Sequence, residues 1–204
     1  MEHITLKEPF VDFIEALKPV SLVITSGLPA SLKTAVAKEI AKIKHYPILH
    51  SDTIRLEVLK GKDVFDPQVA GNIDNRLAVY EEMFRQANTL AKEGNGVILD
   101  ATFVTQGLRI RAADIATKNG LMLVIVKTSC PQQIALTRIK GRSREKYESN
   151  ALTQEAYIAN KNTFEPIDIE DIKSKFPTLK IVHITVDTAQ YESNNWTITK
   201  QEKR

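Results

Sequence analysis

The segment GLPASLKT, residues 27–34, carries the residues best suited to hold a phosphate group. Gly27, Lys33 and Thr34 match the phosphate-loop pattern G-x-x-x-x-G-K-[ST] at their three positions. In such a loop, successive backbone N–H groups form an anion-binding nest, the lysine reaches the terminal phosphates, and the hydroxyl ligates Mg²⁺. We therefore predict that the whole loop binds nucleotide. Its residues are Gly27, Leu28, Pro29, Ala30, Ser31, Leu32, Lys33 and Thr34.

The loop departs from the pattern at Ala30 and at Leu32, which replaces the second glycine. If either residue must take a positive φ, the conformation costs about 1–2 kcal/mol, which weakens a loop without forbidding it. The Leu32 side chain must also point away from the phosphates. Two interpretations stay open: a working phosphate loop, and a strand-to-helix turn without a ligand.

Two aspartates follow apolar runs, at the positions where parallel strands would present ligand-binding groups. Asp100 ends GVILD, and we expect it to hold a metal ion beside Thr34, although it could instead cap the next helix. Asp52 follows YPILH and could act as the base for an acceptor hydroxyl, with Arg55 one helical turn away. Capping of that helix is the alternative role for Asp52.

A basic stretch, RIKGRSREKYE, covers residues 138–148. Arg138 and Arg142 have the i, i+4 spacing of one helix face and could together stabilise the charge on a transferred phosphoryl group. A solvated helix is the simpler interpretation for Lys140, Arg144 and Lys146. The histidines, His3, His45, His50 and His183, lack metal-ligand spacing.

Five apolar runs must position these groups, and their consecutive Val, Ile and Leu residues are typical of strands buried on both faces. They are residues 20–25, 46–50, 96–100, 121–127 and 180–186. A helical stripe recurs through residues 73–91, and residues 1–19 predict a short helix beside the first strand. Alternating strands and helices predict an α/β fold, a three-layer, doubly wound parallel sheet of about five strands. Residues 187–204 read as a frayed polar tail.

The bulk properties fit an ordinary globular domain. The 204 residues, 43% hydrophobic and 26% charged, suit a single domain, 1–204, with a small lid at about 138–152. No apolar run is long enough to span a membrane, and the N-terminus lacks a secretory signal. A lone cysteine, Cys130, fits a reducing compartment, so we expect a cytoplasmic protein. The sequence carries no signal of oligomeric state.

These motifs resemble those of small P-loop kinases, a group that includes zeta toxins, the kinase domain of bacteriophage polynucleotide kinase and many bacterial predicted kinases. GLPASLKT is similar to that family's GLPGSGKT, HSDTIR to S-x-D-x-x-R, and VILDATF to a strand ending in D-A-T-F. Arg109 falls where an arginine usually follows that strand. The similarity runs from about residue 20 to residue 168.

The resemblance implies a P-loop nucleoside triphosphate hydrolase fold and an ATP- or GTP-dependent kinase that uses Mg²⁺ to phosphorylate a hydroxyl. It implies Asp52 as the base, Arg55 and Arg109 as acceptor contacts, and Lys33, Arg138 and Arg142 as groups that stabilise the phosphoryl group. The partners would be a nucleoside triphosphate and a hydroxyl-bearing acceptor, either a small molecule or a nucleic-acid 5′ end. A net charge of +3 and 6% aromatic residues give no support for nucleic acid. A regulatory pseudokinase with a degenerate loop is the alternative.

Overall fold

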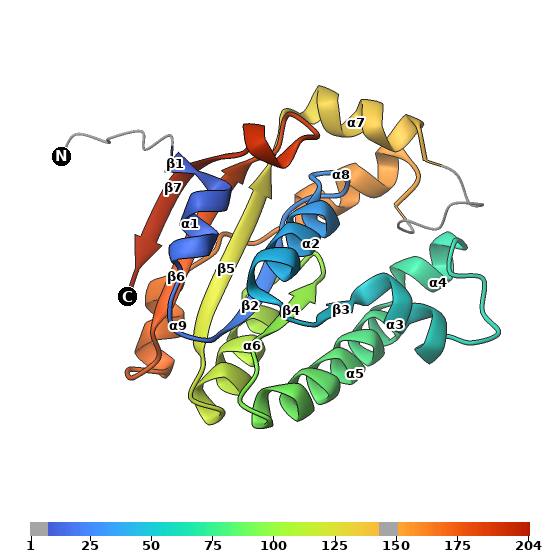
Figure 1. The fold of residues 1–204 in the computed structure, drawn as a ribbon. Coiled ribbons are helices and arrows are strands. Elements are labelled where there is room, and N and C mark those ends of the chain that lie inside the picture. Colours follow the sequence, from blue (N-terminus) through green and yellow to red (C-terminus); the bar gives the residue numbers. More distant parts are fainter. Residues whose placement is uncertain (1–7, 143–150) are drawn as a thin grey trace.

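The computed structural model describes residues 8–142 and 151–204, in which helices cover both faces of a central sheet (Figure 1). The strand order is β1-β7-β6-β5-β2-β4-β3, and the five strands from β6 to the edge strand β3 are parallel. The prediction of a doubly wound sheet is therefore confirmed. The parallel strands are β2 (Ser21–Ser26), β3 (Ile48–His50), β4 (Val97–Asp100), β5 (Met122–Ser129) and β6 (Ile181–Asp187).

Nine α-helices and one short 3₁₀ helix are present in these described ranges. No helix there is both long and apolar enough to cross a lipid bilayer. Residues 143–150 of the expected lid, with Arg144 and Lys146, lie outside the described residues. The helices are α1 (Phe10–Ala16), α2 (Lys33–Lys44), α3 (Ser51–Val58), α4 (Pro67–Gly71), α5 (Ile73–Lys92), α6 (Gln106–Lys118), α7 (Gln132–Lys140), α8 (Gln154–Thr163), α9 (Ile169–Lys175) and the 3₁₀ helix η1 (Ser193–Asn195).

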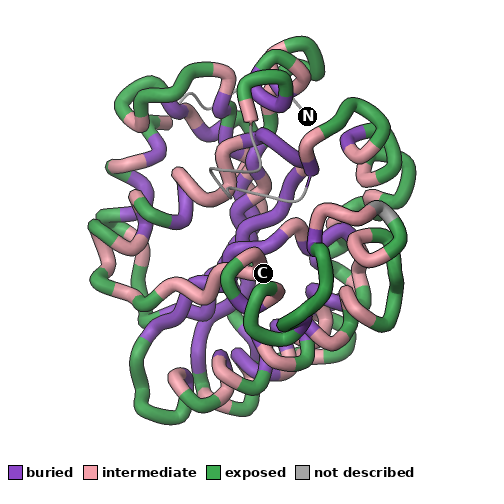
Figure 2. The backbone as a smooth tube through the Cα atoms, turned by 90° about the vertical axis from the view of Figure 1, so that its right-hand side faces the viewer, coloured by how far each residue is buried: buried purple, intermediate pink, exposed green. Residues whose placement is uncertain are grey.

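The strands bury their side chains on both faces, as their unbroken apolar runs predict. Val23 and Ile98 join a cluster with α1 and α2, whereas Leu22 and Leu99 join a cluster with α5, α6 and α9. Figure 2 shows these strands as the buried centre of the molecule. The sheet is thus held between two apolar layers, and its polar strand ends are left at one edge.

The expectation of a frayed tail at residues 187–204 is wrong. Thr197–Lys203 forms β7, antiparallel to β6, and β1 (Glu8–Pro9) pairs with the outer side of β7. Trp196 and Ile198 are almost fully buried, and the Trp196 ring meets Phe10 edge-on at 5.8 Å between centroids. The tail is ordered because it covers the edge of β6, whose backbone groups would otherwise be unpaired.

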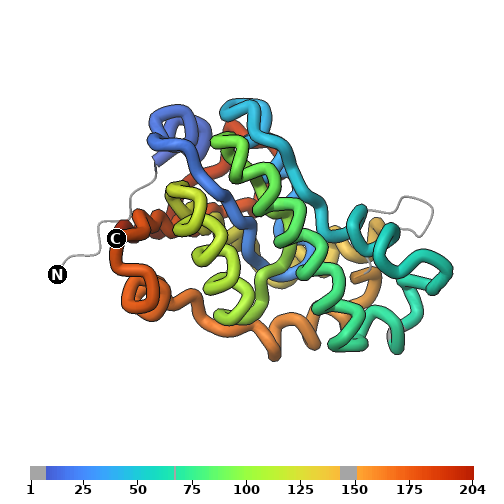
Figure 3. Tube along the Cα trace, turned by 90° about the horizontal axis from the view of Figure 1, so that it is seen from below, coloured from blue at the N-terminus to red at the C-terminus, as the bar shows by residue number. Residues whose placement is uncertain are grey.

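The helix predicted over residues 73–91 is confirmed as α5. Its middle and C-terminal turns pack into the core through residues such as Tyr80 and Phe84, but Ile73 and Leu77 near its start are exposed. Figure 3 shows α5 running beside α6, with its first turns next to α3 and α4. The apolar stripe of α5 is therefore longer than the part that packs on the sheet, and its first residues lie near α3.

Candidate functional site

The loop between β2 and α2 lies at the carboxyl edge of the sheet, where β2 has β4 on one side and β5 on the other. At Gly27 the chain passes so close to β5 that an added Cβ would lie 2.6 Å from Thr128 Oγ1 and 2.7 Å from Thr128 O. Ser31 Oγ lies 2.6 Å from the same hydroxyl, and Thr188 Oγ1 donates to Ser31 O at 2.9 Å. The loop is thus anchored from outside by β5 and by the residue that follows β6.

Both substituted positions take the conformation that glycine favours. Ala30 and Leu32 each have φ of 61°, so the expected cost of about 1–2 kcal/mol applies to each residue. The Leu32 side chain lines the cleft and packs against the apolar cluster beneath α2. The chain therefore keeps the backbone shape of a phosphate loop without the second glycine.

The loop presents backbone donors that have no acceptor. The N–H groups of Ala30, Leu32, Lys33 and Thr34 bond to no acceptor in the described part of the chain. They surround the N-terminus of α2, where the helix dipole adds positive potential. Such a set of donors is suited to an anion with several oxygens.

Lys33 lies beside these donors, and its Nζ donates to Leu28 O at 3.0 Å. Burial lowers the pKa of the Lys33 ammonium to about 8, a shift that the charge of Asp100 partly opposes and the charge of Arg142 increases. An anion in the loop would offset this effect because it favours the charged form.

Asp100 ends β4 and gathers three side chains. It accepts hydrogen bonds at Oδ2 from Thr34 Oγ1 (2.6 Å) and at Oδ1 from Thr25 Oγ1 (3.0 Å), and its Oδ2 lies 3.0 Å from His50 Nδ1. Burial favours the neutral carboxyl, but the hydrogen bonds from His50 and Thr34 and the charge of Lys33 outweigh burial and lower the pKa of Asp100. The N-cap position of the following helix, α6, is Thr105, and no side chain makes a capping bond there, so Asp100 is not its cap.

Asp52 and Arg55 lie in the first turns of α3. Arg55 Nη1 donates to Asp52 Oδ1, and both side chains line the cleft. The N-cap position of α3 belongs to His50, and no side chain makes a capping bond there. The capping alternative for Asp52 is therefore wrong, and its carboxylate is placed on the cleft side with its arginine partner.

Arg138 and Arg142 both line the cleft but do not share a helix face as expected, because α7 ends at Lys140. Arg138 Nη1 donates to Ala30 O at 3.2 Å, and its Nη2 donates at 2.9 Å to both Thr188 O and Ala189 O. Its guanidinium also lies over the Tyr191 ring, 4.5 Å from the centroid. Arg138 thus ties the phosphate loop to the segment after β6, while Arg142 Nη1 donates to Ala151 O at 2.9 Å.

Arg109 does not lie in the cleft, and its assignment as an acceptor contact needs correction. It is fully buried, and its guanidinium donates to the carbonyl oxygens of Phe103, Val104, Glu165 and Pro166. The bonds hold the loop after β4 to the segment that precedes α9. An arginine enclosed by protein acceptors in this way is a structural tie.

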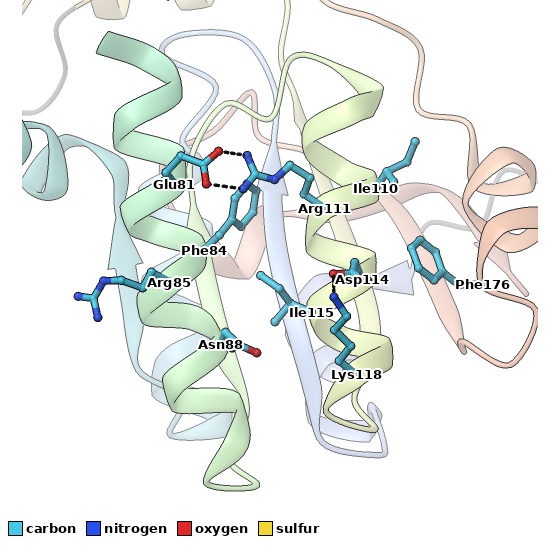
Figure 4. Close-up of a pocket in the computed structure, with 10 residues that line it drawn as sticks. All are labelled: Glu81, Phe84, Arg85, Asn88, Ile110, Arg111, Asp114, Ile115, Lys118 and Phe176. Atoms are coloured by element: carbon cyan, nitrogen blue, oxygen red, sulfur yellow. Dashed lines mark hydrogen bonds and ion pairs between the residues drawn. The ribbon is translucent and has the colours of Figure 1, made fainter. Parts of the chain in front are cut away.

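The charged and polar groups beside the C-terminal half of the loop line a cleft of about 480 Å³. It contains Lys33, Thr34, Asp52, Arg55, Asp100, Arg138 and Arg142. A separate groove of about 560 Å³ lies between α5 and α6 and shares no lining residue with the cleft (Figure 4). No cluster of three or more His, Cys, Asp or Glu residues suited to a metal occurs among the described residues.

Sequence reasoning missed His50, which lines the cleft beside Asp100. The two residues are paired in register at the ends of the adjacent parallel strands β3 and β4. The available signal was positional: each is the last residue of its apolar run. Without the strand order, nothing in the sequence shows that these two runs are neighbours.

Comparison with known proteins agrees with this geometry. A family model described as an AAA domain, AAA_33, matches residues 22–167. The uncharacterized protein Rv2004c of Mycobacterium tuberculosis is 27% identical over 130 residues, which are 61% of this chain and 26% of that protein. The chain thus spans about a quarter of the length of the curated relatives it matches.

Two solved structures share the fold at low identity. A sugar kinase from Janibacter sp. HTCC2649 has a TM-score of 0.60 and 15% identity, over 84% of this chain and 87% of that one. A putative kinase from Chloroflexus aurantiacus has a TM-score of 0.62 and 17% identity, over 87% and 94%. With the family match covering most of the sheet and the loop, the chain belongs to the AAA_33 family of AAA domains, a P-loop kinase-like family.

Proposed function

We propose that the protein is an ATP- or GTP-dependent kinase that transfers the γ-phosphoryl group to the hydroxyl of a small molecule. The observation that carries this proposal is the set of amides of Ala30, Leu32, Lys33 and Thr34, which have no acceptor in the described part of the chain, with the Lys33 ammonium beside them and Asp100 behind Thr34. Phosphoryl transfer needs positioning and charge neutralisation more than covalent chemistry, and this set supplies both.

The residues present fit a Mg²⁺ ion. Magnesium prefers oxygen ligands, and the Thr34 hydroxyl and the charged Asp100 carboxylate offer such oxygens 2.6 Å apart. When bound, the ion would neutralise charge on the β- and γ-phosphates. We assign Thr34 and Asp100 to hold the ion. The loop of residues 27–34 is assigned to orient the phosphate groups of the nucleotide through its backbone N–H groups.

Asp52 is the proposed base for the acceptor hydroxyl, and Arg55 holds its carboxylate and contacts the acceptor. Lys33 and Arg142 are placed to stabilise charge on the transferred group, because both line the cleft beside the loop. Arg138 contributes through its bonds to Ala30, Thr188 and Ala189, which keep the loop in its binding shape.

A small alcohol is favoured over a nucleic-acid 5′ end. The net charge of +3 offers little attraction to a polyanion, and one solved structure of the same fold is a sugar kinase. The test is a screen of sugars, polyols and 5′-hydroxyl oligonucleotides with γ-labelled ATP. Label transferred to small alcohols supports the proposal, and label found only on oligonucleotides would reassign the acceptor.

A regulatory nucleotide-binding protein without turnover is the second candidate, favoured by the positive φ of Ala30 and Leu32. A thermal-shift titration separates the candidates. Binding that stabilises the protein by about 2.7 kcal/mol at a hundredfold excess over Kd, without transfer to any acceptor, would support the regulatory role. No shift with any nucleoside triphosphate would contradict both candidates.

A further inference from the structure

His50 lies at the proposed metal site although no chemistry has been assigned to it. Its side chain is 30% exposed and lines the cleft, and its Nδ1 lies 3.0 Å from Asp100 Oδ2. The same oxygen accepts the hydrogen bond from Thr34 Oγ1 at 2.6 Å. One carboxylate oxygen therefore sits between a hydroxyl oxygen and an imidazole nitrogen.

The two separations are those of hydrogen bonds, and they are also close to the spacing of neighbouring ligands of a single cation. Adjacent ligands of an octahedral ion with bonds of about 2.1 Å lie about 3 Å apart. The hydroxyl–carboxylate and carboxylate–imidazole pairs, at 2.6 and 3.0 Å, are close to this spacing. A cation held by Thr34 and Asp100 could thus reach His50 Nδ1 with small side-chain movements.

The ring can free that nitrogen. A charged carboxylate only accepts hydrogen bonds, so the ring nitrogen that faces Asp100, Nδ1, is the donor of this bond. The proton would pass through solvent to Nε2, which has no hydrogen-bond partner in the described part of the chain. No net proton is gained or lost in this change of tautomer.

We propose that His50 Nδ1 is a third protein ligand at the nucleotide-metal site, and that this chain consequently prefers Mn²⁺ to Mg²⁺. The proposal rests on the proposed function, because it needs the metal beside Thr34 and Asp100. Its chemical basis is that Mg²⁺ takes oxygen ligands almost exclusively, whereas Mn²⁺, a first-row transition ion, accepts an imidazole nitrogen in addition to the oxygen ligands that it shares with Mg²⁺.

The competing role for His50 is a hydrogen bond that only orients Asp100. His50→Asn separates the two roles, because an amide N–H can still donate to the carboxylate but does not replace the imidazole donor. His45→Asn is the matched control: His45 is exposed, lies outside the cleft and has φ of 56°, a conformation that asparagine tolerates.

The first measurement is calorimetric titration of the full chain with ADP and either Mn²⁺ or Mg²⁺. We expect His50→Asn to weaken binding of Mn²⁺–ADP about tenfold or more and to leave Mg²⁺–ADP binding nearly unchanged, with His45→Asn like the parent. An unchanged ratio of the two affinities in His50→Asn would overturn the proposal.

The second measurement is pulsed electron paramagnetic resonance of bound Mn²⁺ in protein labelled with ¹⁵N-histidine, which separates ring nitrogens from those of the nucleotide. A direct histidine nitrogen coupling should be present in the parent and in His45→Asn, and absent in His50→Asn. Tight Mn²⁺–ADP binding without this coupling would show that His50 is not a metal ligand, and it would leave the proposed function standing. Failure of the parent to bind ADP with either metal would defeat the proposed function as well.

Discussion

The cleft at the sheet edge and the groove between α5 and α6 are similar in volume, about 480 and 560 Å³, but differ in how their polar groups are satisfied. In the groove, the charged side chains are paired: Arg111 with Glu81 and Lys118 with Asp114 (Figure 4), and Arg85 with Glu82, which does not line the groove. In the cleft, the N–H groups of Ala30, Leu32, Lys33 and Thr34 have no acceptor among the described residues, and the Lys33 ammonium donates to the Leu28 carbonyl. The unsatisfied donors, and not the volume, indicate where a ligand can be bound.

The largest expected effect is the loss of Lys33. Lys33→Ala should reduce phosphoryl transfer by about 10²–10³-fold or more, because the variant removes the ammonium beside the phosphates. The fold should persist, since within residues 8–142 and 151–204 the Lys33 ammonium bonds only to Leu28 O. Transfer rates and circular dichroism check both points. Lys118→Ala, in the groove, should transfer phosphoryl groups at the rate of the parent. An equal loss of transfer in Lys118→Ala would show that the cleft and the groove do not differ in function.

Asp52→Asn should lower the rate of transfer by about 10²-fold and leave nucleotide binding close to normal. The reason is that the amide cannot take the acceptor proton, whereas the loop lies on another element. Thermal shift with ATP and single-turnover transfer measure the two properties. Asp114→Asn is the groove control. Full activity in Asp52→Asn would leave Asp52 only the role of pairing with Arg55.

Nucleotide affinity should fall as the pH rises above about 8, the pKa of Lys33 in the free protein. Above that pH, phosphate binding must take up a proton, so affinity declines by up to tenfold per pH unit, by about 1.4 kcal/mol. Titrations from pH 7 to 9.5 measure this slope. Lys33→Met should bind weakly with no such slope, and a flat profile in the parent would remove Lys33 from phosphate contact.

The same pKa of Lys33 also decides whether folding stability rises or falls with pH. In the unfolded chain Lys33 has the ordinary lysine pKa of 10.5, whereas in the native state its pKa is about 8. The unfolded state therefore holds more protons in this window, and Lys33 makes stability rise with pH between these values. Denaturant unfolding at pH 8 and 10, compared between the parent and Lys33→Met, isolates the contribution of this group.

Leu32→Gly should change nucleotide affinity less than about threefold, because Leu32 already has the left-handed backbone conformation that the loop needs. The change in stability should be small, since relief of about 1–2 kcal/mol of backbone strain is offset by greater chain entropy and the lost Leu32 packing. Calorimetry with ATP measures the affinity. A large gain would show that the isobutyl group obstructs the phosphates.

The smallest effect is expected in the groove itself. Arg111→Ala breaks a partly exposed ion pair with Glu81, so it should lower stability by about 0.2–1 kcal/mol and leave transfer unchanged. Thermal melting and transfer assays check this. A loss of transfer comparable to that of Asp52→Asn would mean that the groove takes part in the reaction.

Much of the fold and part of the site follow from local patterns. The five parallel strands were predictable because residues buried on both faces must be apolar in succession. Asp52 and Asp100 could be placed at the sheet edge because each follows such a run. The strand β7 was missed because its only buried apolar side chain is Ile198. The strand forms through its pairing with β6, which no local pattern reveals.

The roles of the arginines required the tertiary structure. Arg109 resembles an acceptor contact by position, but its acceptors at Glu165 and Pro166 lie more than fifty residues away in sequence. Arg138 is bound to the loop and to the segment after β6, an arrangement that helical spacing could not predict. Contacts between distant segments are invisible to any pattern read along the chain.

The sequence by itself determined the crossover of strand, phosphate loop and helix, because spacing along the chain decides which amides and which ammonium can surround one anion. Only the tertiary structure decided that Ala30 and Leu32 take positive φ and that His50 stands against Asp100. Both depend on neighbours supplied by other strands: close contact with β5 shapes the loop, and the order of β3 beside β4 brings the imidazole to the carboxylate.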